Sequence, residues 1–498
     1  MSPESRLATP ELRSLKHRIA VIGGGVSGLA AAHRLRELDP RVDVTVFEAG
    51  PRVGGSLCTE RRDGFLLEHG ADNFITNLSW GLDLCRRLGI EEQLIPTRPE
   101  GRRVFVVRDG RLHPVPEGFM VMAPGKLAPV LATPLLSTLG KLRIIAEALV
   151  PRRKDEGDES LASFATRRLG REAFERLVQP LVAGIYTADA TKLSLAATLP
   201  RFLDMEREHG SMIRAMMRQP KSSNKSSDES GARYSLFVAP KHGMSTIVDA
   251  LVERIGRERI RLNTPVERVV HRSEGGWRLM GSGEWGRENC GAEDFDAVIV
   301  STPAPKAAHV LQDAAPELSQ ELRAIEYAGS VVAIVGYRSD QFPQPLQGFG
   351  FVVPDVERRD ILAVSYSSQK YDDRAPEGHV LLRVFLGGAG RPDLVHDSDD
   401  ELRRIVEQQL RELLQVRGEP VLWHLARWPS AMPQYHVGHL DRVARIESLV
   451  ARVPTLALAG NAYRGVGIPQ CIHSGEAAAE RIPKTLLPLG EGAREAGG

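Results

Sequence analysis

Three glycines near the start of the chain have the spacing of a phosphate-binding turn. Gly23, Gly25 and Gly28 form the pattern G-x-G-x-x-G. The first glycine permits a tight strand-to-helix turn, the second allows the backbone to approach a pyrophosphate, and the third allows the helix to pack on the strand. Free N–H groups at the helix N-terminus favour the anion. A dinucleotide site is therefore predicted at this turn, which also contains Gly24, Val26 and Ser27.

A carboxylate is placed to complete this site. Glu48 follows a predicted strand, Val42–Phe47, and lies 20 residues beyond Gly28. A carboxylate at this separation accepts hydrogen bonds from ribose hydroxyls. The glycine pattern alone is weak evidence because glycine-rich turns are common. The prediction therefore depends on Glu48 and on the elements that flank the glycines.

The segment after Glu48 indicates which dinucleotide binds. Ala49, Arg52, Gly54 and Gly55 belong to Glu-Ala-Gly-Pro-Arg-Val-Gly-Gly. This segment resembles one found in flavoproteins of the amine oxidase and porphyrinogen oxidase group. There the paired glycines approach the FAD diphosphate and the arginine lies beside the cofactor. The resemblance implies FAD rather than NAD, and the alternative is a surface turn that carries one solvated arginine.

These residues need a parallel sheet behind them. Arg18–Ile22 is predicted to be a buried strand and Leu29–Leu38 a helix. Phe295–Val300 and Thr455–Asn461 are predicted to be further buried strands, with a last helix from about Cys471. The nucleotide domain is therefore expected to be discontinuous. We expect the N-terminus of the last helix to face the flavin N1/O2 region, where its dipole favours the reduced anionic flavin.

Composition excludes several classes of protein. The 498 residues are enough for two or three domains, and 65 basic against 64 acidic side chains leave no charge that favours nucleic acid. The four cysteines are far apart, which argues against a disulfide framework and a zinc site and fits a reducing compartment. Leu112–Val150 is the most apolar region but lacks 18 uninterrupted apolar residues. It is predicted to be a buried helix pair, with a membrane-surface segment or a substrate channel as alternatives.

The rest of the chain is predicted to supply two more domains. Helices are expected over Leu78–Leu88, Asp399–Leu414 and Leu161–Leu177, with Pro180 ending the last of these and turns following it to Leu199. Antiparallel strands are expected in four segments and one hairpin: 331–337, 350–353, 361–366, 380–385, and 104–112. Ile260–Val270 and Trp277–Met280 are predicted to form a separate antiparallel layer.

The predicted fold class is α/β (α+β overall), a Rossmann-like FAD-binding domain with an antiparallel-sheet substrate domain and a helical domain. The predicted domains are FAD-binding residues 17–85, 236–310 and 445–485, substrate-binding residues 86–112 and 311–444, and helical residues 113–218, with 1–16, 219–233 and 486–498 as flexible segments.

Six motifs occur in the order found in one flavoprotein family. They are GGGVSGLAAA, EAGPRVGG, GIYTADATKLSL, APKHGM, MPQYHVGHL and GVGIPQCIHSGEAA. From Arg18 to about Ile482 the chain resembles the oxygen-dependent protoporphyrinogen and coproporphyrinogen oxidases of haem biosynthesis. The resemblance implies FAD, a six-electron oxidation of a porphyrinogen, O2 as acceptor and H2O2 as product. It also implies a cytoplasmic protein, at most peripheral at the membrane, with ferrochelatase as transfer partner.

The resemblance also implies site residues. The cofactor positions are Gly23 to Gly28, Glu48, Ala49, Arg52, Gly55, Gly70, Ala71, Asp72, Asn73, Val266, Val466, Gly467 and Ile468. The substrate positions are Arg102 or Arg103, which could hold a propionate, together with Tyr371 and Gly184. Paired arginines are also typical of a solvated face. Ala71 departs from the Gly-Pro turn frequent in the family.

No catalytic side chain and no metal ligand are assigned, because the flavin carries out the hydride step. His436 and His439 could be a base or a metal pair, but a structural role is preferred. Cys471 could suggest a covalent flavin link, but a buried helical cysteine is preferred. An amine oxidase, a carotenoid desaturase and a non-catalytic carrier of hydrophobic ligands stay as alternatives. The sequence leaves the choice between protoporphyrinogen IX and coproporphyrinogen III open.

Overall fold

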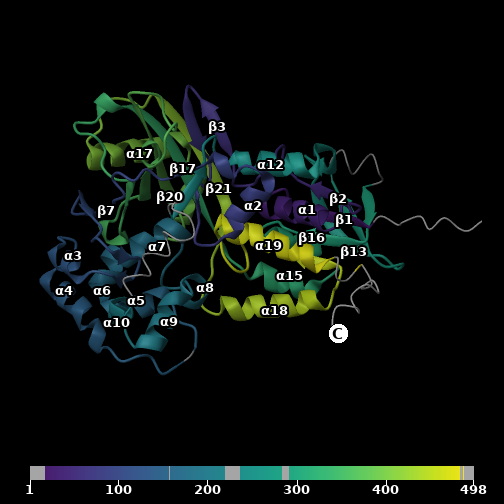
Figure 1. Cartoon of the computed structure of the whole chain (residues 1–498), viewed down its shortest axis with the longest axis horizontal. Coiled ribbons are helices and arrows are strands. Elements are labelled where there is room, and N and C mark those ends of the chain that lie inside the picture. The colour runs from purple at the N-terminus through teal and green to yellow at the C-terminus, as the bar shows by residue number, and fades with distance from the viewer. Residues whose placement is uncertain (1–16, 156, 219–235, 283–290, 483–485, 487–498) are drawn as a thin grey trace, which may run out of the picture.

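The structure is a computed structural model that describes residues 17–155, 157–218, 236–282, 291–482 and 486. The predicted flexible segments 1–16 and 219–233, and all of 486–498 except Leu486, lie outside the described residues. Figure 1 shows an elongated molecule with a nucleotide-binding part around α1 and β1 and a group of helices, α3 to α10, at the far end. A large sheet that contains β17 and β20 lies beside these helices.

A five-stranded parallel sheet forms the centre of the nucleotide-binding part. Its order is β12 (Ile260–Arg261), β2 (Asp43–Phe47), β1 (Arg18–Ile22), β16 (Ala297–Val300) and β22 (Leu456–Leu458). The predicted strands are confirmed, with two corrections. Ile260–Arg261 belongs to this sheet rather than to an antiparallel layer, because it pairs with β2. Phe295 ends the neighbouring strand β15, and only Ala297–Val300 pairs with β1.

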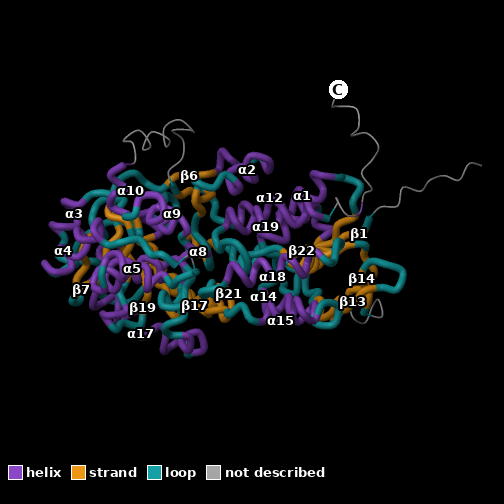
Figure 2. Tube along the Cα trace, turned by 90° about the horizontal axis from the view of Figure 1, so that it is seen from below, coloured by secondary structure: helices purple, strands orange, loops and turns teal. Residues whose placement is uncertain are grey.

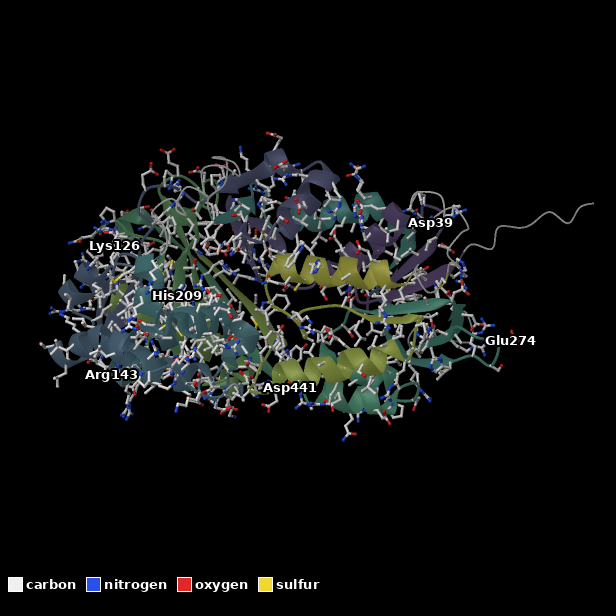
Figure 3. All side chains as sticks on the ribbon, turned by 60° about the horizontal axis from the view of Figure 1, so that its bottom comes forward. Asp39, Lys126, Arg143, His209, Glu274 and Asp441 are labelled. Carbon is white, nitrogen blue, oxygen red and sulfur yellow. The ribbon has the colours of Figure 1, made fainter. Side chains whose placement is uncertain are left out.

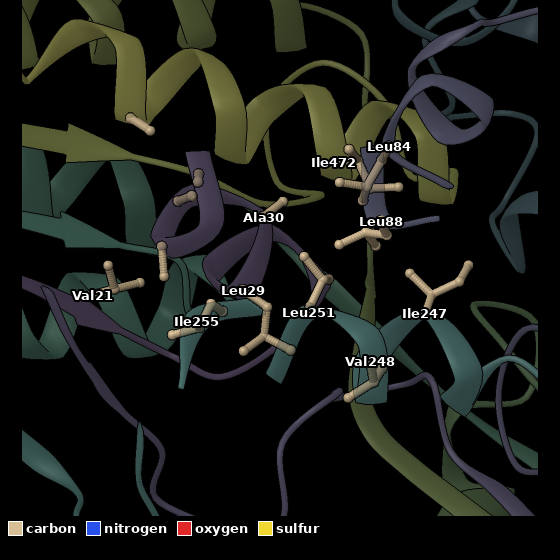
Figure 4. Close-up of a cluster of buried hydrophobic side chains, with 14 of the residues drawn as sticks. Val21, Leu29, Ala30, Leu84, Leu88, Ile247, Val248, Leu251, Ile255 and Ile472 are labelled. Carbon is tan, nitrogen blue, oxygen red and sulfur yellow. The ribbon is translucent and has the colours of Figure 1, made fainter. Parts of the chain in front are cut away.

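Four helices cover one face of this sheet: α1 (Val26–Leu38), α2 (Trp80–Leu88), α12 (Ser245–Ile255) and α19 (Ile468–Arg481). Their apolar side chains meet in one core, in which Leu29 of α1 lies near Leu251 of α12 and Ile472 of α19 lies near Leu84 of α2 (Figure 4). Helices α1 and α19 approach closely at Gly475, where a Cβ would lie 2.1 Å from the Ser27 carbonyl oxygen. The first and last elements of the chain are thereby packed together.

The other face of the sheet is covered by three helices and a small antiparallel sheet. The helices are α14 (Ala304–Leu311), α15 (Pro316–Arg323) and α18 (His439–Ala451), and the strands are β13 (Val266–His271), β14 (Trp277–Gly281) and β15 (Ala292–Phe295). Trp277 and Phe295 are fully buried in the core that these elements share. Figure 2 shows β13 and β14 at one end of the molecule, far from α3 and α4.

A seven-stranded sheet forms the second part. Its order is β21 (Leu422–Pro433), β17 (Tyr327–Arg338), β20 (His379–Gly387), β19 (Ile361–Tyr366), β18 (Gly350–Val352), β7 (Val104–Arg108) and β8 (Arg111–Pro114). The prediction of an antiparallel sheet is confirmed for every pair except β18 and β7, which are parallel. Helix α17 (Asp399–Leu414) packs Leu402, Val406 and Leu410 on one face. The opposite face is turned toward the nucleotide-binding part and the helices.

Short strands link these parts. They are β3 (Thr59–Arg62), β4 (Phe65–Glu68), β5 (Phe74–Ile75), β6 (Leu94–Pro96), β9 (Phe119–Met120), β10 (Ala123–Pro124) and β11 (Phe237–Pro240). Strand β6 lies in the range predicted for the substrate domain but pairs with β11. The single-turn helices are α16 (Ser367–Lys370), η1 (Glu91–Gln93), η2 (Ala146–Leu149), η5 (Arg257–Arg259), η6 (Ser339–Gln341), η7 (Asp355–Glu357) and η8 (Pro392–His396).

The helical part corrects one prediction. Its helices are α3 (Leu127–Ala132), α4 (Thr138–Ile145), α5 (Leu161–Leu169), α6 (Arg171–Ala173), a π-helical turn η3 (Phe174–Val178), α7 (Gln179–Tyr186), α8 (Leu195–Thr198), α9 (Pro200–His209) and α10 (Met212–Arg218). Pro180 does not end a helix: it lies in the first turn of α7, where a missing N–H is tolerated. The break instead falls at Gly170, whose φ of 92° ends α5.

Candidate flavin and substrate site

The carboxyl ends of β1, β2 and β16 meet at one edge of the parallel sheet, and the predicted phosphate-binding turn lies there. The Gly23 N–H donates to the Phe47 carbonyl (2.8 Å). The Ser301 hydroxyl, just after β16, lies 2.9 Å from the Gly23 carbonyl oxygen, to which it donates. In open parallel sheets, ligands bind at this edge. The turn is therefore held by its two neighbouring strands.

The three glycines of the turn have different surroundings. Gly23 has a φ of 107°, which favours glycine. A Cβ on Gly28 would lie 2.0 Å from the Gly23 carbonyl oxygen, so Gly28 permits close packing of helix and strand. A Cβ on Gly25 would meet no described atom within 4 Å. The space in front of Gly25, at the N-terminus of α1, thus fits a pyrophosphate held by backbone N–H groups.

A second glycine loop lies against the first. The Gly54 N–H donates to the Gly24 carbonyl (2.7 Å), and a Cβ on Gly55 would lie 3.4 Å from the Gly25 Cα. The exposed Arg52 donates from Nη2 to the Gly55 carbonyl (2.8 Å). Both glycine-rich segments therefore border the same space, as a dinucleotide site requires.

Glu48 joins the two glycine loops. Its Oε2 accepts from the Gly24 N–H and its Oε1 from the Gly50 N–H, both at 2.8 Å. The exposed Ala49 follows it. The Glu48 carbonyl accepts from the Thr264 N–H (2.9 Å), which brings the start of β13 and Val266 to the same edge. The carboxylate is thus fixed in orientation at the end of β2.

The second strand–helix junction lies beside the first. Helix α19 begins at Ile468, one turn earlier than predicted, with Gly467 as its N-terminal flanking residue. Cys471 is buried in this helix, and burial raises the pKa of its thiol to about 11. Its Sγ lies 3.9 Å from the carbonyl oxygen of Val466. The Cys471 thiol also lies beside Ser27 in the first turn of α1, so the N-termini of α1 and α19 lie near one another.

The segment Gly70–Asn73 is held between both parts of the molecule. A Cβ on Gly70 would lie 2.2 Å from the Ser56 carbonyl oxygen, so the segment lies directly against the second glycine loop. Asp72 pairs with Lys370 (3.3 Å) and Arg383 (3.1 Å) of the seven-stranded sheet region. Although burial opposes it, these two cations lower the pKa of Asp72 to about 2. Half-buried Ala71 and Asn73 flank this carboxylate.

The predicted substrate residues occupy three different settings. Tyr371 is 1% exposed, just after α16. Gly184 lies within α7, where a Cβ would be 3.6 Å from Val352 of the seven-stranded sheet. Arg102 and Arg103 are exposed before β7, and Arg102 donates to the carbonyls of Arg98 and Thr97. The structure does not bring these arginines into contact with Tyr371 in the described chain.

The sequence and fold have known relatives. Residues 26–483 match flavin-containing amine oxidoreductase. The chain belongs to the flavin-containing amine oxidoreductase family. The resemblance to flavoproteins and the prediction of FAD are thereby confirmed, and the protein is an oxidoreductase.

Two relatives and one solved structure are similar to the chain in sequence, and a second solved structure shares its fold. Bacillus subtilis coproporphyrinogen III oxidase is 33% identical over 93% of this chain and 97% of its own. Arabidopsis thaliana protoporphyrinogen oxidase 2 is 30% identical over 93% of each chain. A candidate protoporphyrinogen oxidase from Exiguobacterium has a TM-score of 0.82 and 32% identity, covering 94% and 99%. Cyclohexylamine oxidase from Brevibacterium oxydans, at 16% identity and a TM-score of 0.67 over 94% and 99%, shares the fold.

Two residues of this flavoenzyme site escaped the sequence analysis. Glu68 is buried and accepts from the Met244 N–H and the Thr59 hydroxyl, both at 2.8 Å. Burial raises its pKa to about 7. Arg383 is also buried, although it stands within the apolar strand β20. A charged residue between apolar neighbours in a predicted central strand is a signal that could have found Arg383.

The histidines have structural surroundings. The His439 ring stacks on Tyr435 (centroids 4.0 Å apart) and its Nε2 lies 2.9 Å from the Tyr463 carbonyl oxygen. His436 lies 3.7 Å from Glu326 at the surface. These contacts agree with the preferred structural role.

Three other side chains could hold a metal ion by distance alone. Potential ligand atoms of Glu60, His69 and His424 lie within 4.8 Å of one another. A guanidinium already supplies positive charge there: Arg62 donates to Glu60 (2.8 Å) and its Nη2 lies 3.4 Å from His424 Nδ1. The Arg62 guanidinium therefore balances the charge of the Glu60 carboxylate between the two imidazoles, and no metal ion is required for that.

Proposed function

We propose that this flavoenzyme oxidises a porphyrinogen to the porphyrin in haem biosynthesis, with coproporphyrinogen III as substrate. The supporting observation is similarity along the whole length of enzymes with that name. The coproporphyrinogen III oxidases of Bacillus subtilis and Staphylococcus aureus are 33% and 32% identical, and the matches cover 97% and 98% of their lengths. In this proposal O2 reoxidises the flavin and gives H2O2.

The proposed site assigns each part of the cofactor to residues at the sheet edge. The turn 23–28 and the loop 52–55 hold the diphosphate, Glu48 holds the ribose, and Val266 borders the adenosine end. The residues 70–73 and 466–468 border the flavin ring. When bound, FAD accepts the hydride that leaves a methylene bridge of the substrate. The protein contributes binding, orientation and exclusion of water. The domain ranges given from the sequence stay a prediction.

The decisive experiment measures porphyrin fluorescence in air from purified FAD-loaded protein. Coproporphyrinogen III and protoporphyrinogen IX are supplied separately, and heat-denatured protein gives the spontaneous rate. Faster porphyrin formation with release of peroxide supports the proposal, and the preferred substrate decides between the two porphyrinogens. Oxidation of monoamines, polyamines or carotenoids, without porphyrinogen oxidation, would instead assign another activity of the family.

We further propose a cytoplasmic enzyme that binds peripherally to a membrane and passes its product to ferrochelatase. No helix in the described part of the chain is both long and apolar enough to cross a bilayer. The helical part nevertheless exposes apolar side chains: Leu131, Leu139, Leu142, Ile145 and Leu149. The basic residues Lys141, Arg152 and Lys154 flank them. Figure 3 labels Arg143 at this end of the molecule. Apolar side chains beside basic ones are typical of surfaces that lie on anionic membranes.

A further inference from the structure

Four buried polar groups on β19, on β20 and in the segment after β19 have no hydrogen-bond partner of standard geometry among the described residues. They are Ser365 Oγ, Ser367 Oγ, Tyr371 Oη and Arg383 Nε. Their residues are 9%, 4%, 1% and 2% exposed, respectively. Buried polar groups in native proteins are nearly always hydrogen-bonded, since an unmade bond costs the full desolvation of the group. Several in one place therefore indicate a polar ligand.

Two strands and one loop bring these groups together. Ser365 on β19 is the direct cross-strand partner of Arg383 on β20, so both side chains lie on the same face of the sheet. Arg383 uses Nη1 for Asp72 and Nη2 for the Gly70 carbonyl, which leaves Nε. Tyr371 lies beside Asp72, and the Asn73 side chain approaches its hydroxyl without completing a hydrogen bond of standard geometry. The unpartnered groups thus adjoin the segment that borders the proposed flavin ring.

The same region holds three cations and two carboxylates: Arg374 and Arg383 are buried and Lys370 is half-buried, while Glu68 is buried and Asp72 half-buried. Lys370 and Arg383 share Asp72, while Arg374 is buried and donates to the backbone carbonyls of Lys241, Pro240 and Asp372. Glu68 is the other carboxylate near Arg374 and Arg383. Its pKa of about 7 means that it is only partly ionised at neutral pH. A buried excess of positive charge requires a compensating anion.

We propose that Ser365, Tyr371 and Arg383 form a binding site for one carboxylate of the substrate. This inference rests on the proposed function, because a porphyrinogen carries carboxylates as propionates. The flavin ring does not supply the missing charge, since the oxidised ring is neutral and the FAD diphosphate is assigned to the glycine turn. Neutral hydroxyls and a guanidinium together suit a carboxylate, which accepts several hydrogen bonds at once.

The test measures binding of coproporphyrin III, the non-reacting oxidised form, to FAD-loaded protein by fluorescence quenching. Its tetramethyl ester has the same ring without the carboxylates. We expect Tyr371→Phe and Ser365→Ala to weaken coproporphyrin binding roughly tenfold each, the scale of one hydrogen bond to a charged group. Binding of the ester should not change. The Ser365 hydroxyl bonds to no described protein group, so a purely structural role predicts no such loss for Ser365→Ala.

Arg383→Gln should weaken coproporphyrin binding by more than about tenfold, and Arg383→Lys should restore part of it because the charge returns. Arg427→Gln is the matched control: Arg427 is on the same sheet but bonds to Val395 and Asp399 on the other side. In turnover, the substrate-binding variants should raise KM more than they lower kcat. FAD absorbance confirms that each variant remains folded and loaded.

The failures of the two proposals are distinguishable. A wild-type enzyme that oxidises no porphyrinogen contradicts the proposed function. A wild-type enzyme that oxidises and binds coproporphyrin, while Tyr371→Phe, Ser365→Ala and Arg383→Gln bind it equally well, overturns the carboxylate site. Equal weakening for acid and ester also overturns it, because the loss would then arise from shape rather than charge.

Discussion

At the scale of single residues, Glu48 is the clearest test of the cofactor site. Its carboxylate is oriented by the N–H groups of Gly24 and Gly50, so it can present its remaining lone pairs to a ribose. We expect Glu48→Ala to weaken FAD binding about 10- to 100-fold, which corresponds to about 1.5–3 kcal/mol for bonds to a charged group. The ratio of flavin to protein absorbance after dialysis measures this. Unchanged retention, against wild type treated alike, would contradict the assignment.

Glu68 predicts a dependence of stability on pH. Because its pKa is raised from 4.5 to about 7, the folded protein holds the proton more tightly than the unfolded chain between these values. The stability that this proton adds is present below pH 4.5 and is lost as pH rises through 7. The loss is about 3 kcal/mol at about 1.36 kcal/mol per pKa unit. The free energy of unfolding is measured by denaturant titration for wild type and Glu68→Gln at pH 5 and pH 8. The variant should gain stability relative to wild type at pH 8. Equal differences between the two proteins at both pH values would refute this.

The sequence revealed the residues that depend on local spacing and missed those that depend on tertiary contact. Glu48 was predictable because it follows Gly28 at a fixed separation along two adjacent strands. Glu68 was not, because its partner Met244 is distant in sequence. Arg383 carries a local signal as a charged residue in an apolar strand, but its pairing with the distant Asp72 was not predictable. Arg102 and Arg103, in contrast, were selected from the sequence alone. Their guanidinium groups suit a carboxylate, but both side chains are exposed, so binding of a propionate there stays a prediction.

At the scale of elements, two glycines of the phosphate-binding turn have different roles: Gly28 is needed for packing of the fold and Gly25 for binding of the cofactor. Gly25 has an ordinary φ of −70°, and its Cβ position is open, so Gly25→Ala should leave the melting temperature of the FAD-free protein unchanged but weaken FAD binding. Gly28→Ala should lower that melting temperature, because its Cβ would meet the Gly23 carbonyl oxygen at 2.0 Å. Thermal unfolding with and without FAD measures both. Similar effects of the two substitutions would contradict the assignment of roles.

Element types followed from the sequence wherever the apolar pattern was strong, as in β1, α2 and α17. Boundaries failed where backbone geometry mattered more. The π-helical turn before α7 has no simple periodicity, so the sequence pattern predicts a helix end at Pro180, whereas Pro180 lies in the first turn of the next helix. Ile260–Arg261 was assigned to the wrong sheet because two residues carry no alternation, and only pairing with β2 determines their place.

At the scale of the whole molecule, the exposed leucines of the helical part predict membrane binding that is separate from catalysis. Leu139 and Leu149 are 78% and 81% exposed, so replacing both with serine should leave folding and turnover in detergent unchanged. Binding to vesicles that contain anionic lipid should fall about 100-fold or more, since each fully buried leucine contributes about 1.5–3 kcal/mol. Co-sedimentation with such vesicles measures this. Equal sedimentation of variant and wild type would exclude this surface as the contact.

The close packing of α1 on α19 has a consequence for synthesis of the protein. The strand β1 leaves the ribosome early, yet its sheet neighbours β16 and β22 and the helix α19 are translated hundreds of residues later. The nascent chain must therefore keep the apolar surface of α1 from aggregating until α19 has been translated. Premature termination before Ile468 should yield a polypeptide that depends on chaperones and captures no flavin, however intact its glycine turn.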